Sequence, residues 1–425
     1  MKNSRLLTIF IIVFVDLLGF SLILPLLPYY ADEYGASPFV VGLLVASYAA
    51  ASLVGSPLLG RLSDRIGRRP TLLFSVLGTL AGFLLLGLAA PAGEGLARLI
   101  APNASKAFVL GFLFFARILD GLTAGNLTVA QAYISDVTDE KNRAKGLGLI
   151  GAAFGLGFII GPAVGGLLSK VSYSLPAFVA AGIAALNLVQ IFFLLPESLT
   201  PEKREEMGET QRPPFTIKAL VTALNRPIVG PLLHVRFLFG IAFSMFQSIF
   251  TLYAQYKLGL TPDKTGYILA YVGVLSVIVQ GGLIGVLTKR FRENWLIITG
   301  LWLMAGAMIG WAFAPNLVTL LIIMIPMALA GGVLGTVLQS AITKSVKPAE
   351  VGGMLGISGS LEAVSRVIAP TAGSLLLGKL GTWAPGVFGA VLITWVVWFA
   401  YRKIILVKSS GKQGQHAQDP VPVVD

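Results

Sequence analysis

Twelve long apolar runs restrict the fold of this sequence more than any other feature. Each run has about 20 residues or more, the length that crosses the hydrocarbon core of a bilayer as a helix. The runs lie at approximately 6–30, 39–59, 71–90, 105–134, 146–168, 175–195, 231–254, 265–288, 295–313, 317–341, 351–377 and 383–401. The first run is too long for the apolar part of a signal peptide, so we interpret it as a retained helix. The sequence therefore predicts an all-α integral membrane protein with twelve transmembrane helices.

The composition supports this class and excludes others. Of the 425 residues, 55% are hydrophobic and 12% are charged, whereas a soluble globular protein carries about a quarter charged residues. This balance excludes a soluble enzyme, a nucleic-acid-binding domain and a disordered scaffold, and the net charge of +12 fits the basic cytoplasmic loops of a membrane protein. The chain has no Cys and two His, so we expect neither a metal site nor a cofactor.

The basic residues predict the orientation in the membrane. Of the 32 Lys and Arg residues, 23 lie at the two ends or on the even-numbered connections, six lie on the opposite connections, and Arg117, Arg236 and Arg366 fall inside runs. Because the cytoplasmic loops of membrane proteins are the basic ones, both termini are predicted to be cytoplasmic, in a cell (inner) membrane.

A long polar connection divides the runs six and six. Weak self-similarity appears across it, because Gly60–Arg65 matches Gly285–Arg290 and Gly161–Leu168 matches Ala369–Leu376. Duplicated six-helix halves are typical of transporters that move one half against the other. We predict an N-terminal six-helix bundle at 1–195, a cytoplasmic linker at 196–230, a C-terminal six-helix bundle at 231–403 and a disordered cytoplasmic tail at 404–425.

Three motifs resemble those of the major facilitator superfamily. The stretch Gly60-Arg61-Leu62-Ser63-Asp64-Arg65-Ile66-Gly67-Arg68-Arg69-Pro70 looks like its signature loop, and Gly157 to Gly166 looks like the span-five motif of its antiporters. Asp16-Leu17-Leu18-Gly19 is similar to a first-span motif of the twelve-span drug:proton antiporters, which include tetracycline exporters. One departure is that run 265–288 lacks the His that tetracycline exporters carry there. The resemblance implies two pseudo-symmetric bundles and alternating access. The six-plus-six design needs no second chain, so we expect function as a monomer.

The signature loop implies a cytoplasmic gate that locks the outward-facing state. Glycines permit its tight turn, and the arginines can reach carboxylates across the interface between the halves. The alternative is that the basic residues only fix the topology. The gate set is Gly60, Asp64, Arg65, Gly67, Arg68, Asp136 and Arg143.

Small residues repeat at four-residue spacing in the fifth run. Such a stripe lets two helices approach closely, and proline bends the helix. We expect it to seal the outer gate between the fifth and eleventh runs; the alternative is generic close packing. The set is Gly157, Gly161, Pro162, Gly165, Gly166, Pro370 and Gly373.

Charged residues inside the runs point to the functional site. A charge near the bilayer centre costs at least about 2.5–3.5 kcal/mol, so each needs a partner or a use. We expect Asp16, Arg117, Asp120, Glu362 and Arg366 to line one central cavity and to couple protons, because a carboxylate that alternately meets water and a guanidinium takes up and releases a proton. The alternative for Arg117–Asp120 and for Glu362–Arg366 is a local ion pair within one helix. Substrate-cavity candidates are Thr128, Gln131, Ser244, Gln247, Ser248, Tyr253 and Tyr271.

The leading functional hypothesis is a secondary active transporter that exports a small amphipathic organic molecule or drug in exchange for protons. A proton-coupled symporter that imports a metabolite is the alternative, and a non-transporting receptor or scaffold is a weaker one. No nucleophile–base set and no nucleotide-binding loop appear, so neither an enzyme nor an ATP-driven pump is expected. The expected partners are a small-molecule substrate, protons and the lipid bilayer, with no nucleic acid.

Overall fold

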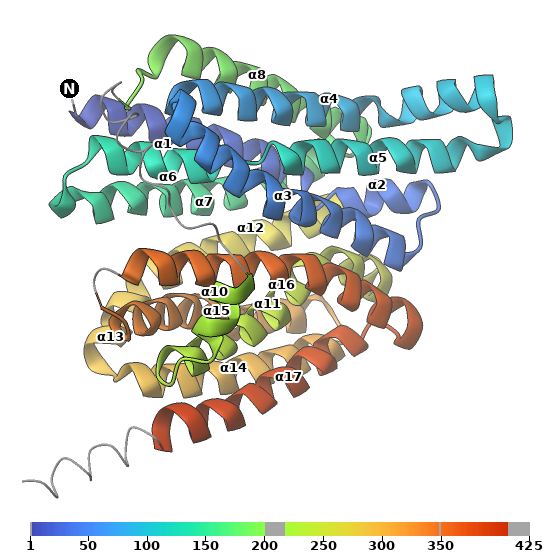
Figure 1. Cartoon of the computed structure of the whole chain (residues 1–425). Helices are drawn as coiled ribbons and strands as arrows, with labels where there is room; N and C mark the ends of the chain where they lie inside the picture. Colours follow the sequence, from blue (N-terminus) through green and yellow to red (C-terminus); the bar gives the residue numbers. More distant parts are fainter. Residues whose placement is uncertain (1, 200–216, 348–349, 407–425) are drawn as a thin grey trace, which may run out of the picture. The chain divides into compact units, whose positions relative to one another are not determined.

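The computed structural model of the chain describes residues 2–199, 217–347 and 350–406 (Figure 1). Regular structure in these three ranges is helical throughout, without strands, which confirms the predicted all-α class. Part of the predicted linker, 200–216, and most of the predicted tail, 407–425, lie outside the described residues.

The helices follow one another with short connections. They are α1 (Lys2–Ile23), α2 (Leu27–Glu33), α3 (Pro38–Ile66), α4 (Arg68–Ile100), the short η1 (Pro102–Ala104), α5 (Ser105–Leu122), α6 (Asn126–Val137), α7 (Glu140–Leu168), α8 (Ser174–Leu194), α10 (Ile217–Leu224), α11 (Val229–Leu258), α12 (Pro262–Ile278), η2 (Val279–Leu283), α13 (Ile284–Arg290), α14 (Glu293–Phe313), α15 (Leu317–Lys344), α16 (Val351–Leu380), α17 (Ala384–Ala400) and η4 (Tyr401–Leu406).

Eleven helical stretches among the described residues are long and apolar enough to cross a membrane. They match eleven of the predicted runs. The remaining run lies in α16, whose 30 residues are long enough to span but are less apolar because they include Glu362, Arg366 and several Gly and Ser residues. With α16, the helices give the predicted twelve-helix membrane fold.

The chain forms two compact units by its internal contacts. Unit 1 comprises Met1–Pro213, Met245–Val277 and Arg366–Pro385, and unit 2 comprises Pro214–Ser244, Ile278–Ser365 and Gly386–Asp425, each without the residues outside the described ranges. Helices α11, α12 and α16 contribute to both units. The predicted division into six-helix bundles at 1–195 and 231–403 stays a prediction.

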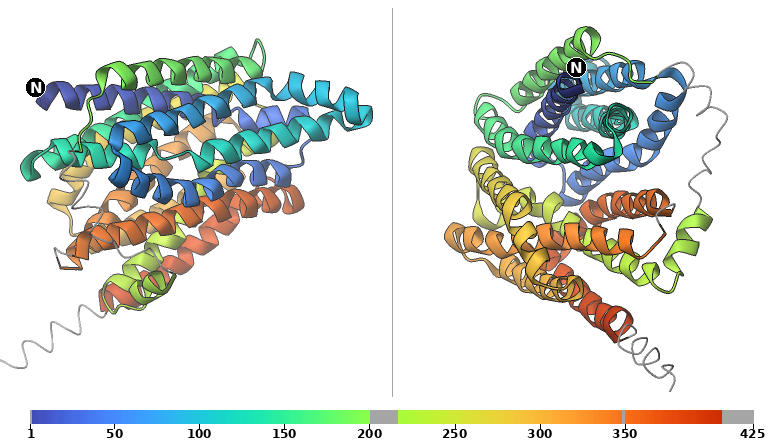
Figure 2. Two further views of the ribbon diagram at one scale, coloured as in Figure 1. Left: turned by 45° about the horizontal axis from the view of Figure 1, so that its top comes forward. Right: turned by 90° about the vertical axis from the view of Figure 1, so that its left-hand side faces the viewer.

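In unit 1, helices α1 to α8 pack around one another (Figure 2). Helix α4 packs on α5 and α8, α1 packs on α7 and α8, and α3 packs on α5. A buried apolar cluster at one end joins Ile12 of α1, Leu72 of α4, Tyr133 of α6, Ala153 of α7 and Ile191 of α8. This shared core fixes the relative positions of the helices that carry Asp16 and its neighbours.

In unit 2, α14 packs along α15. Between α12 and α13 the chain stays helical but winds more loosely over the short segment η2. The five residues Val279–Leu283 form one π-helical turn before α13 resumes α-helical geometry. Such single turns insert an extra residue into a helix and are frequent at functional sites.

Large apolar side chains cover the outer faces of the helices. Phe193 is 74% exposed and Val318 67%, and many other Leu, Ile, Phe and Trp residues are exposed. Apolar surface of this extent is stable in lipid and not in water. The protein is therefore a multi-pass integral membrane protein.

Candidate functional site

The fourth span is broken in the middle. The sequence predicted one continuous run at 105–134, whereas α5 ends at Leu122 and α6 begins at Asn126. Side chains from neighbouring helices satisfy the backbone groups at the break: the Ser56 and Ser75 hydroxyls donate to the Ala124 and Thr123 carbonyls, and the Gly125 N–H donates to Ser75 at 3.0 Å. Broken helices of this kind build the binding sites of many transporters.

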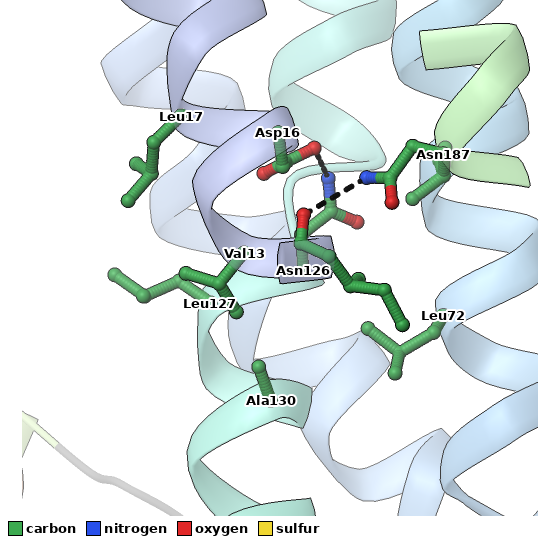
Figure 3. A pocket seen from close by; sticks show the side chains of 10 residues that line it. Val13, Asp16, Leu17, Leu72, Asn126, Leu127, Ala130 and Asn187 are labelled. Atoms are coloured by element: carbon green, nitrogen blue, oxygen red, sulfur yellow. Dashed lines mark hydrogen bonds between the residues drawn. The ribbon is translucent and has the colours of Figure 1, made fainter. Parts of the chain in front are cut away.

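Asp16 meets the first residue after this break. The Asn126 side-chain amide donates to the Asp16 carboxylate at 2.6 Å, and the two residues line a small cavity together with Asn187 of α8 (Figure 3). The cavity has a volume of about 10 Å³, close to what one water molecule needs. The side-chain oxygens of Asn126 and Asn187 are buried and, among the described residues, without a hydrogen-bond partner. The cavity therefore offers three acceptor groups to one small donor.

Arg117 and Asp120 form a buried ion pair on the last turns of α5. Their side chains are 3% and 4% exposed, and Arg117 Nη1 donates to Asp120 Oδ2 at 2.9 Å. The guanidinium also lies over the Tyr48 ring, 4.2 Å from its centre, which adds a cation–π contact. This geometry is that of a local ion pair, the alternative to a coupling role, because both partners belong to one helix and neutralise each other.

Arg68 is the centre of the predicted cytoplasmic gate. It is 2% exposed, and its guanidinium bonds Asp64 at 2.6 Å, Asp136 at 2.9 Å and the Ser63 hydroxyl at 2.6 Å. The backbone turns sharply before it at Gly67, whose φ of 110° favours glycine. These partners lie on α3 and α6 within unit 1. Contacts of the arginines across the interface between the halves stay a prediction.

Glu197 completes this cluster, and the sequence analysis did not single it out. Its carboxylate accepts from the backbone N–H groups of Arg68 and Arg69 at 2.9 and 3.1 Å, at the N-terminus of α4. A carboxylate is stabilised there because the first helical N–H groups lack partners within the helix. The signal in the sequence is an acid in Pro196-Glu197-Ser198, directly after the sixth apolar run.

Three other members of the gate set are less central. Arg65 is exposed to solvent, and Gly60 is half-buried with Thr128 near it. Arg143 lies on α7, but its side chain is outside the described part of the structure. The role of the whole set stays a prediction.

The glycine stripe of α7 faces two helices. A Cβ atom at Gly161 or Gly165 would lie 2.0 Å from Ser21 Oγ or 2.3 Å from the Leu22 carbonyl oxygen of α1, and one at Gly157 would meet Leu17. On another side, a Cβ at Gly166 would lie 2.8 Å from Asp263 Cα of α12. The close approach is real, but the neighbours are the first and eighth spans.

The partner expected for this stripe was the eleventh span, and there the structure corrects the prediction. Pro370 and Ser374 of α16 lie against Gly42 of α3, where a Cβ would be 2.6 Å from the Pro370 oxygen, and Gly373 lies against Met245 and Ile249 of α11. Equivalent small-residue motifs need not pack on each other. Each motif allows another helix to approach closely, but it does not determine which helix that is.

Polar contacts join α2 and the segment after α7 to α11, α12 and the turn between them, within unit 1. The Tyr29 hydroxyl contacts the Leu260 carbonyl at 2.8 Å and the Thr265 hydroxyl at 2.7 Å. Gln255 and Tyr256 donate to the Asp32 carboxylate at 2.8 and 2.7 Å.

An ion pair lies in the same region. Lys170 pairs with Asp263 at 3.0 Å, and this hydrogen bond raises the pKa of Lys170. The basic residues predict that these connections lie on the non-cytoplasmic side. For this reason we call Tyr29, Asp32, Lys170 and the partners named above the outer latch.

Unit 2 contains a larger cavity around a second ion pair. Arg236 of α11 donates to Glu362 of α16 at 2.9 Å and to the Gly335 carbonyl of α15 at 3.0 Å. The cavity has a volume of about 470 Å³, within the range of small-molecule sites. Its lining residues are Arg236, Gln280, Gly331, Gly332, Gly335, Thr336, Gln339, Leu355, Gly359 and Glu362.

The sequence offered Arg366 as a local partner of Glu362 within one helix. In unit 2 Glu362 pairs with Arg236, which the sequence did not suggest, and the Glu362–Arg366 pair stays a prediction. Asp16 and Glu362 also line different cavities, one in each unit. The common central cavity for Asp16, Arg117, Asp120, Glu362 and Arg366 therefore stays a prediction.

The seven substrate-cavity candidates line neither of these two cavities. Tyr253 is 0% exposed, and its role as a substrate-cavity residue stays a prediction. Ser244 is also buried, whereas Ser248 and Tyr271 are half-buried and Thr128, Gln131 and Gln247 are exposed. Helical periodicity alone could not separate core-facing from cavity-facing positions in runs that are apolar on all sides.

Comparison with known proteins supports the same fold. The profile described as Major Facilitator Superfamily matches residues 9–294 and 258–424. The solved structure of the human organic anion transporter MFSD10 (TETRAN) superposes with a TM-score of 0.67 at 21% sequence identity, over 94% of this chain and 99% of that one.

Curated relatives cover most of the chain. The class C tetracycline resistance protein of Escherichia coli is 30% identical over 379 residues, which are 87% of this chain and 88% of that protein. Multidrug resistance protein 2 of Bacillus subtilis is 28% identical over 376 residues, with coverage of 87% and 88%. The chain therefore belongs to the major facilitator superfamily, in the group that contains the tetracycline and multidrug resistance proteins.

Proposed function

We propose that this transporter exports a small amphipathic organic molecule in exchange for protons, by alternating access of a central site. The observation that carries the proposal is the contact between Asp16 and Asn126 at the break of the fourth span. Burial of a carboxylate inside a spanning helix costs free energy. An ion pair within the helix does not offset this cost for Asp16, because the group that donates a hydrogen bond to Asp16 is the neutral amide of Asn126.

The position of Asp16 suits a group that gains and loses a proton. Its carboxylate lies beside a water-sized cavity with two unsatisfied amide oxygens. One water molecule there would bond both oxygens and leave a short path for a proton to the carboxylate. Asp120 lies on α5, before the break, and pairs with Arg117. The carboxylates of Asp16 and Asp120 therefore have different environments.

The outer latch supports the alternating-access part of the proposal. Tyr29, Asp32 and Lys170 all contact residues of α11, α12 or the turn between them, through side chains that can exchange these partners for water. A transporter that opens outward must break such contacts, and their polar groups can then bond water instead, which limits the cost of opening. Export from the cytoplasm is supported further by the matched resistance proteins, whose names describe drug resistance.

The test is proton release on substrate addition by the full chain in detergent and in liposomes with an imposed pH gradient. Tetracycline and a lipophilic dye are the first probes. We expect the Asp16→Asn variant to abolish proton release and coupled efflux while it keeps substrate binding. Unchanged coupled efflux in that variant would remove Asp16 from the mechanism.

A matched control substitutes another aspartate in the same way. Asp139 caps α7 by accepting from the Asn142 backbone N–H at 2.9 Å, outside the predicted spans. Because Asn caps helices about as well as Asp, Asp139→Asn should leave efflux and stability near wild type. Influx of substrate down the same gradient would favour the symport alternative over export.

A further inference from the structure

We infer that the cavity in unit 2 binds the polar head of a dipolar ligand, one that carries an anionic and a cationic group on neighbouring atoms. Arg236 and Glu362 are the recognition pair: the ligand's anionic group bonds the guanidinium and its cationic group bonds the carboxylate. The inference rests on the proposed function and narrows its substrate class to zwitterionic amphipathic molecules.

The cavity presents both charges to its interior. Arg236 and Glu362 both line it, with side chains 14% and 35% exposed, although the pair lies between spanning helices. The guanidinium is oriented by the Gly335 carbonyl, which accepts from Nη1 while Nη2 bonds Glu362. An ion pair that only stabilised the packing of the helices would have no need of an adjoining cavity of about 470 Å³.

Charge balance selects the ligand. The two charged side chains that line the site have opposite signs. A ligand with a single charge can bond only one of them, and it does so in competition with the existing Arg236–Glu362 pair, which is unfavourable in a membrane-embedded site. A dipolar ligand pairs with both, so the site discriminates against simple cations and simple anions of the same shape.

The remaining wall provides room and neutral hydrogen bonds. Three glycines of α15, at 331, 332 and 335, and Gly359 of α16 lie on the wall, and a Cβ at Gly359 would meet nothing within 4 Å. The carboxamides of Gln280 and Gln339 both donate and accept, which suits a dipolar head. Gln280 belongs to the π-helical turn η2, so the extra residue of that turn sets the position of a side chain on the cavity wall.

The experiment compares three probes that share one skeleton. Phenylalanine carries both charges, 2-phenylethylamine carries only the ammonium and 3-phenylpropionate only the carboxylate. Equilibrium binding to the full chain in detergent is measured with radiolabelled phenylalanine and by displacement with the other two. We expect phenylalanine to bind at least about tenfold more tightly than either single-charge probe, because each of them leaves one partner of the pair unmatched. Equal affinities for the three probes would overturn the inference.

Variants separate recognition from folding. Arg236→Gln should weaken phenylalanine binding by at least about tenfold, and Gln339→Leu should weaken it less, without a change in charge. The double variant Arg236→Gln/Glu362→Gln removes both charges of the pair. It should therefore fold even where the single variant does not, and it should bring the three affinities to within about twofold. Retained preference for phenylalanine in the double variant would contradict the assignment.

A second ion pair in the same unit is the control. Arg226 and Glu350 are joined at 2.8 Å, each 39% exposed, and neither lines the cavity. Arg226→Gln should leave phenylalanine affinity unchanged. If the protein exports a probe in exchange for protons but binds the three phenyl compounds equally well, only this inference is refuted. If it binds phenylalanine selectively but no substrate moves with protons in liposomes, only the proposed function is refuted.

Discussion

The side-chain amide of Asn126 donates a 2.6 Å hydrogen bond to the carboxylate of Asp16, across the point where the fourth span breaks. Asn126 is the first residue of α6, so its position depends on the break itself. The serine hydroxyls that satisfy the broken backbone therefore also hold the donor of Asp16 in place. A shift of α6 relative to α1 would change the surroundings of the carboxylate.

Replacement of Asn126 by Leu should reduce proton-coupled efflux by about tenfold or more. The substitution keeps a similar volume and removes the hydrogen bond to a charged group, which contributes about 1.5–3 kcal/mol. Efflux from liposomes and proton release are measured on the same preparation. Asn142→Leu is a suitable comparison, because Asn142 is exposed on α7. Equal efflux in both variants would show that the contact has no role in coupling.

Arg117 and Asp120 allow the structural and functional interpretations of the buried pair to be separated. Loss of one partner leaves an uncompensated buried charge and costs about 3–5 kcal/mol, so Arg117→Met and Asp120→Leu should each lower the apparent unfolding temperature strongly. The double variant should regain most of this stability. If the pair only neutralises itself, the double variant will also regain efflux; if Asp120 takes part in coupling, it will not.

Substitution of Ala for Gly should have opposite effects on stability at two positions of α7. Gly165→Ala places a Cβ 2.3 Å from the Leu22 carbonyl oxygen, and we expect a loss of about 1–3 kcal/mol because the α1 backbone must move. Gly151 has nothing within 4 Å, so Gly151→Ala should be neutral or stabilise the helix by about 0.5–1 kcal/mol. Thermal unfolding in detergent measures both. Equal shifts would indicate that the close packing is unimportant.

Much of the fold was predictable because length and hydropathy decide membrane spans. The described helices match the predicted runs, and even α16, the least apolar, was identified by its length and by its likeness to the fifth run. Breaks within spans were not predictable. The fourth span contains Gly121 and Gly125, but glycine is common in membrane helices. The hydroxyls that satisfy the backbone at the break, Ser56 of α3 and Ser75 of α4, come from other helices.

The site was predictable residue by residue but not pair by pair. Charges inside apolar runs identify Asp16, Arg117 and Glu362 without a structure, since burial of a charge requires a reason. The Arg236–Glu362 pair was missed because the two residues are 126 positions apart in sequence and Arg236 lies near the end of its run. Spacing along one helix suggests Arg366 as a local partner, and only tertiary packing brings Arg236 to Glu362 in unit 2.

The exposed pair Arg226–Glu350 predicts a pH effect with a defined sign. The hydrogen bond from Arg226 lowers the pKa of Glu350, so the pair stabilises the fold above the unfolded pKa of Glu350, about 4.3, and this contribution is lost as the pH falls through the lower folded value. We expect Arg226→Gln to unfold slightly more easily than wild type at pH 7, with the difference vanishing toward pH 3. A difference that grew on acidification would contradict the assignment.

The outer latch can be tested by cross-linking because the chain contains no Cys. The Gln255 amide donates to the Asp32 carboxylate at 2.8 Å, so a double variant Asp32→Cys/Gln255→Cys brings two thiols close together in this state. If the latch opens in each cycle, a short thiol cross-linker should stop efflux and a reductant should restore it. The single-Cys variants should be insensitive to the reagent. A cross-linked double variant that still exports at the wild-type rate would show that these residues stay together throughout transport.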